Sequence, residues 1–140
     1  MFSPSKDDVR RFFIEAWKRR LGLLTPLETM AVDWIEQHPE YHAELEADDA
    51  LERDYGVEQG RSNPFLHLSM HLSISEQVSI DQPPGIKQAS QLLSARLGPH
   101  AAQHAIMECL GQMLWTAQRS GLAPDGDAYV DCVRRRATRD

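Results

Sequence analysis

The sequence lacks any apolar run approaching the roughly 20 residues that a membrane-spanning helix requires, so we expect no membrane insertion. It also lacks an excess of basic residues, because 15 Lys and Arg stand against 21 Asp and Glu, for a net charge of -6. Nucleic-acid binding depends on basic surface that neutralises phosphates, so this charge argues against a nucleic-acid partner. A protein partner or a homodimer stays open.

Cysteine is scarce, with only Cys109 and Cys132 in the whole chain. The two lie in helical-looking segments without CxxC spacing, so we expect reduced, packed thiols, which are typical of cytosolic proteins. The first residues, MFSPSKDDVRRFF, lack the charged-then-apolar pattern of an export signal. Both observations lead us to expect a cytoplasmic protein.

Common catalytic and nucleotide-binding motifs are missing as well. The chain contains no GxGxxG, no GxxxxGK(S/T) and no GxSxG sequence. Its 140 residues are 41% hydrophobic and 26% charged, which is the size and balance of one ordinary globular domain. We therefore expect a single domain spanning residues 1–140.

Helix signals are frequent along the chain. Thr25 followed by Pro26 and Glu28 is a capping-box start, and Pro39 disfavours helical geometry at His38. The segment after Pro39 is polar and is expected on the surface, and the last helix is expected to be short with a fraying basic tail. The sequence predicts an all-α fold, a compact single-domain bundle of about five or six helices, with helical segments at 3–24, 25–38, from 39 onward, 63–81, 86–97, 100–120 and from 125 onward.

The longest apolar-rich stretch runs from Asn63 to Asp81 and reads NPFLHLSMHLSISEQVSID. Its apolar residues alternate with polar ones between Leu66 and Ile74, which is the pattern of a strand. Its length and its Asn63-Pro64 start favour a helix instead. We predict a buried helix at the centre of the bundle and keep the strand as the alternative.

Histidine spacing is the main chemical signal. All six histidines fall into pairs separated by four residues: His38/His42, His67/His71 and His100/His104. Glu108 follows the third pair by four more residues. Residues four apart share one face of a helix, so such a pair can ligate one cation, as the two histidines of HExxH do. Imidazole suits zinc, iron and nickel, and a carboxylate can complete a mixed site.

Helical angles of about 100° per residue indicate which way these side chains face. With His67 at zero, His71 falls at about 40° and Ile74 at about -20°, so the histidines share a core-facing side. Glu76 falls at about 180° and points away. In the later helix, Glu108 lies about 40° from His104, beside the apolar arc.

These angles predict one divalent metal ion, zinc, iron or nickel, bound by ligands from two or three helices. The candidate ligands are His67, His71, His104 and Glu108, with His38 or His42 as an addition from the polar segment. A metal-dependent hydrolase is the enzyme that this site would suit, with Glu76 or Asp81 as the general base, although the sequence identifies no catalytic residue.

Each feature also has a simpler interpretation. A histidine pair at this spacing is often structural, and His38/His42 lies on a polar segment where solvated side chains are common. The alternative function is a non-catalytic protein-protein interaction module, in which the acidic segment after Pro39 binds a partner and the histidines are structural.

Two segments, NPFLHLSMHLSISEQVSIDQPPGI and QHAIMECLGQMLWTAQRSG, resemble a bacterial family described as domain of unknown function 1841. The likeness extends over nearly the whole chain. It implies a small bacterial cytoplasmic protein and carries no activity or ligand set with it.

Overall fold

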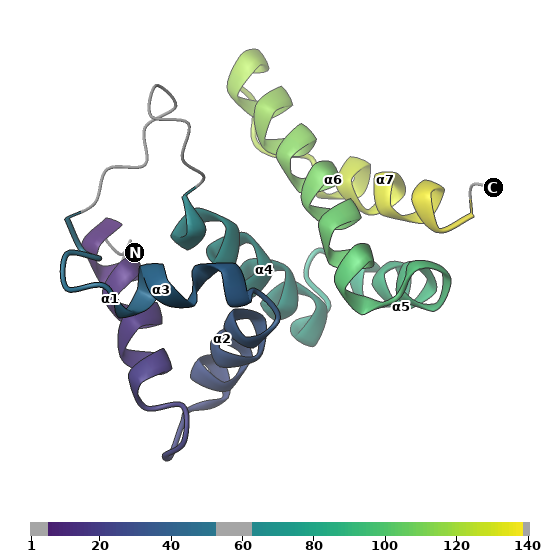
Figure 1. Ribbon diagram of the computed structural model, residues 1–140. Helices are drawn as coiled ribbons and strands as arrows, with labels where there is room; N and C mark the ends of the chain where they lie inside the picture. Colours follow the sequence, from purple (N-terminus) through teal and green to yellow (C-terminus); the bar gives the residue numbers. More distant parts are fainter. Residues whose placement is uncertain (1–5, 53–62, 139–140) are drawn as a thin grey trace. The chain divides into compact units, whose positions relative to one another are not determined.

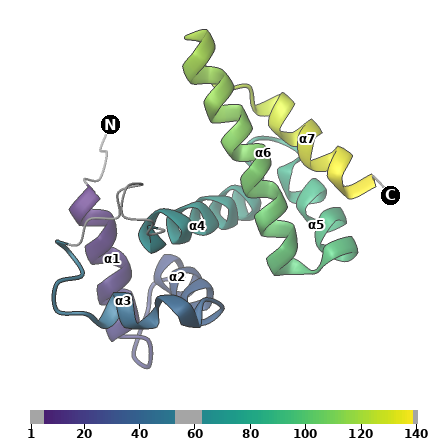
Figure 2. The same ribbon diagram turned by 45° about the horizontal axis from the view of Figure 1, so that its top comes forward.

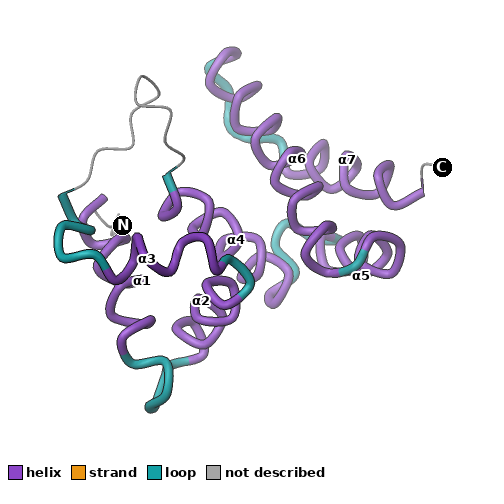
Figure 3. The backbone as a smooth tube through the Cα atoms, in the orientation of Figure 1, coloured by secondary structure: helices purple, strands orange, loops and turns teal. Residues whose placement is uncertain are grey.

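The computed structural model describes residues 6–52 and 63–138, and every regular element in these ranges is a helix (Figure 3). The all-α prediction is confirmed, and the strand alternative for Leu66–Ile74 is excluded. The expected five or six helices become seven α-helices and one 3-10 helix in the described part. No helix there is long and apolar enough to cross a membrane.

The chain divides into two compact units, Met1–Leu72 and Ser73–Asp140. The single domain over residues 1–140 therefore stays a prediction. Helix α4 contributes to both units, because the division falls inside it. The first unit also contains α1 (Lys6–Lys18), α2 (Pro26–Glu36), η1 (Pro39–Tyr41) and α3 (His42–Glu46), and α4 spans Pro64–Ile80.

Apolar faces of these helices form the core of the first unit, where α1 packs against α2 and α3 (Figure 1). Phe13 and Ile35 are essentially inaccessible, and Leu68 of α4 is fully buried in the same cluster. Leu45 is the buried residue of the short α3. Pro39 opens one 3-10 turn before α3 begins, so the single polar helix expected there becomes two short elements.

A capping box fixes the start of α2, as the sequence predicts. The backbone N–H of Glu28 donates to Thr25 Oγ1 at 3.1 Å, and the backbone N–H of Thr25 donates to Glu28 Oε1 at 2.8 Å. The bond from the Thr25 backbone lowers the pKa of the Glu28 carboxyl, and Arg19, which forms an ion pair with it, lowers it further. The carboxylate form of Glu28 is thus the one that the folded chain stabilises.

We expect Thr25→Ala to lower the free energy of unfolding by about 1 kcal/mol, because the Glu28 N–H loses its acceptor. The lowered pKa of Glu28 adds stability at neutral pH that is lost as the pH falls below about 4.3 and through the folded-state pKa. Urea titrations at several pH values should therefore show a smaller acid-induced loss for Glu28→Gln than for the unchanged chain. Equal losses in both proteins would contradict the role given to this carboxylate.

Helix α4 starts where the sequence predicts. Asn63 Oδ1 accepts the backbone N–H groups of Phe65 at 3.0 Å and Leu66 at 3.2 Å, and Pro64 is the first helical residue. The helix ends at Ile80, and Asp81 follows with a φ of 54°. The helix is buried along part of its perimeter, and Leu66, one of its apolar residues, is exposed.

The second unit contains three further helices that pack on one another in pairs (Figures 1 and 2). Gly98, with a φ of 87°, separates the first two. Tyr129 lies 1% exposed in the third, and its hydroxyl donates to Gln77 Oε1 of α4 at 2.6 Å. These helices are α5 (Ile86–Leu97), α6 (Pro99–Ser120) and α7 (Gly126–Thr138).

Two expectations about the second unit are wrong. Cys109 of α6 and Cys132 of α7 form a disulfide, rather than two reduced thiols, because the packed helices bring their Cα atoms to 5.8 Å. Helix α7 is also longer than expected and includes the basic residues Arg134 to Arg136. Contacts hold this basic end in place: Arg136 Nη1 donates to Glu108 Oε2 at 2.9 Å, and Arg96 Nη1 donates to the Arg136 carbonyl.

Candidate metal centre

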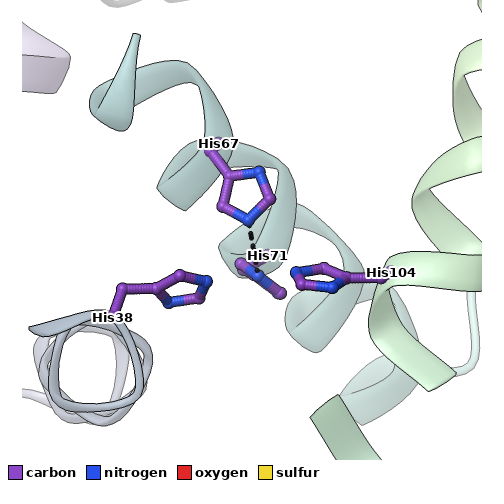
Figure 4. Close-up of side chains that lie close together, drawn as sticks. All are labelled: His38, His67, His71 and His104. Atoms are coloured by element: carbon purple, nitrogen blue, oxygen red, sulfur yellow. Dashed lines mark hydrogen bonds between the residues drawn. The ribbon is translucent and has the colours of Figure 1, made fainter. Parts of the chain in front are cut away.

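Three histidines meet in the first unit, from two separate parts of its chain. His67 and His71 lie on α4, and His38 lies between α2 and η1 (Figure 4). Each offers a ring nitrogen, and these nitrogens all lie within 4.8 Å of one another. His38 and His71 are buried, at 3% and 0% exposure, and His67 is half-buried.

The spacing on α4 brings its two histidines together as predicted. Their ring centroids are 4.7 Å apart, and the two Nε2 atoms are separated by 3.2 Å. Two nitrogens bound to zinc at about 2.05 Å, at the tetrahedral angle, lie about 3.3 Å apart. The His67 and His71 nitrogens are thus spaced as one edge of a tetrahedral metal site.

His38 enters the site because Pro39 turns the chain out of the helix. His38 has φ -126° and ψ 67°, outside the helical region, as expected for a residue before proline. Its Nδ1 lies 2.7 Å from the Trp34 carbonyl oxygen, which can only accept, so Nδ1 carries the hydrogen. This bond leaves the lone pair on Nε2, and it is the kind of contact that orients histidine ligands in metal sites.

Aromatic side chains hold two of the imidazoles in place. The Trp34 ring stacks on His71, with centroids 4.0 Å apart and planes at 13°. The Tyr41 ring stacks on His38, with centroids 5.2 Å apart and planes at 5°. Burial, together with the charge of Glu40, raises the pKa of the Tyr41 phenol, so this side chain stays neutral. These contacts limit ring rotation and favour one fixed arrangement of nitrogens.

Neither Trp34 nor Tyr41 is among the site residues that the sequence predicts. Sequence spacing could have predicted one of these contacts, because Trp34 and His38 are four residues apart and the Trp34 carbonyl accepts a hydrogen bond from the His38 ring. The stacking on His71 joins α2 to α4, which are distant in sequence. No local pattern predicts a contact of that kind.

His42, an expected alternative to His38, has other contacts. Its Nε2 donates to the Ile35 carbonyl at 2.9 Å, and its ring centroid lies 4.4 Å from that of Trp17. The structure therefore brings His38, and not His42, to the pair on α4. His42 contributes to packing between α1 and the segment after α2.

The predicted ligands His104 and Glu108 lie on α6, in the second unit. The His104 ring centroid is 4.5 Å from that of His100, and Glu108 forms an ion pair with Arg136. Arg136 thus supplies a positive charge beside the Glu108 carboxylate within the second unit.

The two residues suggested as general bases, Glu76 and Asp81, both lie in the described part of the chain. Glu76 is exposed on α4, as its opposite angle to the histidines predicts. Asp81 Oδ1 accepts the backbone N–H groups of Gly85 at 3.1 Å and Lys87 at 3.0 Å, so it stabilises the turn after α4. Neither placement favours a role in proton transfer at the histidines.

Three imidazoles from two chain segments can serve as ligands for one borderline metal ion. Metal binds the neutral form of imidazole through the ring nitrogen that carries the lone pair. Among the described residues, the cluster that could hold an ion contains no carboxylate or cysteine. The cluster is therefore a site with histidine ligands only, and zinc, iron and nickel can all bind to such a site.

Neither the comparison with curated proteins nor the comparison with solved structures gave a match. A protein-family profile described as Domain of unknown function (DUF1841) matches residues 5–135 of the 140-residue chain. The match includes α1 to α6 and all but the last three residues of α7. The chain therefore belongs to the family described as Domain of unknown function (DUF1841).

Proposed function

We propose that the Met1–Leu72 unit binds one divalent transition-metal ion through His38, His67 and His71. The observation that carries this proposal is the 3.2 Å separation of the His67 and His71 Nε2 atoms, which matches the edge of a tetrahedral site. The bond from His38 Nδ1 to the Trp34 carbonyl supports it, because it directs the lone pair of that ring to Nε2.

Zinc is our first choice among zinc, iron and nickel. Catalytic zinc sites commonly have three protein ligands, which can all be histidine, and keep one position for water. The sequence-based expectation that His104 also ligates the ion remains a prediction, with water as the alternative occupant of that position.

More specifically, we propose that the bound ion supports metal-dependent hydrolysis. When bound, a divalent ion would supply Lewis acidity and lower the pKa of a coordinated water. The half-buried His67 gives one open side to an otherwise buried cluster, which a small substrate would need. The His38 ring, held by Trp34 and Tyr41, would fix the position of the ion during such a reaction.

The interaction module is the competing function, in which the same histidines only pack. One acidic residue of the segment after Pro39 already has an internal role, because Trp17 Nε1 donates to Glu46 Oε2 at 2.9 Å. A purely structural cluster requires no metal, so metal content separates the two functions.

The test is elemental analysis of protein purified without a histidine tag or added metal. We expect about one equivalent of zinc, iron or nickel per chain, and less than about a tenth of that in a His38→Gln, His71→Gln double variant. A His42→Gln, His100→Gln double variant, which removes the same number of imidazoles, should keep the metal. Retention in His104→Ala would remove His104 from the ligand set without affecting the proposal.

Metal-free protein that also fails to take up added zinc, iron or nickel would sink the proposal and favour the interaction module. Equal metal loss in both double variants would do the same, because it would indicate nonspecific binding to surface imidazoles.

A further inference from the structure

A cavity of about 520 Å³ opens between α6 and α7, within the second unit. Both cysteines of the disulfide line it, together with three polar residues of α6 and one cationic side chain of α7: Gln112, Thr116, Ser120 and Arg135. Cavities that bind small molecules commonly have about 300 to 1,000 Å³. This one is therefore large enough to admit a small molecule to the disulfide.

The two sulfurs differ in their surroundings. Cys109 is 1% exposed in the core of α6, whereas Cys132 is half-buried on α7. A thiolate opens a disulfide by attacking one sulfur and releasing the other, so the more accessible sulfur is the one attacked. Cys132 is thus the expected point of attack, and Cys109 the leaving thiolate.

Arg135 gives the cavity a preference for charge. Its neighbours are paired, Arg134 with Asp131 and Arg136 with Glu108, whereas the Arg135 side chain has no ion pair among the described residues. A guanidinium without an ion pair in the described part of the chain suits a carboxylate, which it can bind through two parallel hydrogen bonds. Asp125, the residue before α7, also lines the cavity, and its negative charge disfavours a second anion there.

We propose that this cavity is a thiol-exchange site, in which a carboxylate-bearing low-molecular-weight thiol opens the Cys109–Cys132 disulfide. The thiolate sulfur forms a bond to Cys132 Sγ, the bond between Cys132 and Cys109 breaks, and Cys109 leaves as a thiolate that takes a proton from water. A second molecule of the same thiol releases Cys132, which yields two protein thiols and one small-molecule disulfide. The two electrons that reduce the protein come from the two small thiols.

The proposal is independent of the metal site, because the cavity and the three clustered histidines belong to different units. It assigns a role to the Arg135 side chain, for which the described residues provide no ion pair. It also gives the disulfide a chemistry beyond its mechanical role of joining α6 to α7.

The test compares mercaptopropionate, which carries a carboxylate, with neutral mercaptoethanol as reductants of the folded full-length chain. Each rate is divided by the rate of the same thiol with a small aliphatic disulfide, which removes differences in intrinsic reactivity. We expect Arg135→Gln to slow the mercaptopropionate reaction on the order of threefold to tenfold and to leave the mercaptoethanol reaction unchanged. Arg134→Gln, the matched loss of one positive charge on the same helix, should change neither rate.

Peptide mapping after an acid quench identifies the first adduct. We expect mercaptopropionate on Cys132. An adduct on Cys109 would overturn the proposal, and so would equal slowing by Arg134→Gln and Arg135→Gln. A reduction rate that does not depend on thiol concentration would also overturn it, because the disulfide would then open only after the chain unfolds.

Discussion

Replacing His71 with alanine is expected to weaken metal binding by more than about a hundredfold. It is also expected to lower the free energy of unfolding of the metal-free chain by about 2 to 4 kcal/mol. The ring is fully buried and stacked on Trp34, so its removal leaves a cavity in the core of the first unit as well as an incomplete ligand set. Zinc titration followed by calorimetry, and urea denaturation in the presence of a chelator, measure the two effects separately.

His67→Ala is the control that separates ligand loss from core damage. This side chain is half-buried, so its removal should cost only about 1 kcal/mol in the metal-free chain, while metal binding falls as far as in His71→Ala. If the histidines are only structural, His67→Ala should change neither metal binding nor the free energy of unfolding appreciably.

Bound metal should also stabilise the unchanged chain. Zinc at about 100 times its dissociation constant should raise the free energy of unfolding by about 2.7 kcal/mol, because only the folded chain assembles the three nitrogens. The same zinc concentration should have little effect on either alanine variant. A uniform shift in all three proteins would instead indicate binding at other sites.

Opening the Cys109–Cys132 disulfide is expected to lower the free energy of unfolding by about 3 kcal/mol. The cysteines are 23 residues apart, so the bond closes a loop that contains the end of α6 and the start of α7. Reduction opens this loop and raises the conformational entropy of the unfolded chain. Urea denaturation with and without a phosphine reductant measures the difference.

A Cys109→Ser, Cys132→Ser double variant provides the comparison for this second prediction. Its stability should equal that of the reduced chain to within about 1 kcal/mol and should not respond to the reductant. A reductant effect on the double variant would assign the loss to another cause. Equal stability of the oxidised and reduced chains would contradict the constraint that the disulfide places on α6 and α7.

Local signals in the sequence predict much of this fold. Thr25 with Glu28 and Asn63 with Pro64 mark helix starts that the structure confirms, because capping depends on residues within one turn. The same local geometry predicts that His67 and His71 face one side of α4 and that Glu76 faces the other. The outward side chain of Leu66 shows where the apolar pattern overstated burial.

Contacts between distant segments account for what the sequence could not show. His38 was one of two alternatives, and only the turn before Pro39, with the Trp34 carbonyl, selects it over His42. The disulfide depends on the packing of α6 against α7, which neither cysteine spacing nor helix pattern contains.

The disulfide also affects the expectation about location. Disulfides persist mainly in oxidising compartments, and the expectation of a cytoplasmic protein rested partly on reduced thiols. Cytoplasmic location therefore stays a prediction without that support.

X-ray absorption at the edge of the bound metal tests the histidine site most directly. The arrangement of His38, His67 and His71 predicts at least three imidazole nitrogens at about 2.0 to 2.1 Å from the ion, with the outer-shell scattering that imidazole rings produce. In the His38→Gln, His71→Gln double variant, zinc added back should show fewer than two imidazole ligands. A spectrum of the unchanged chain with oxygen ligands only, or with one imidazole, would contradict the site.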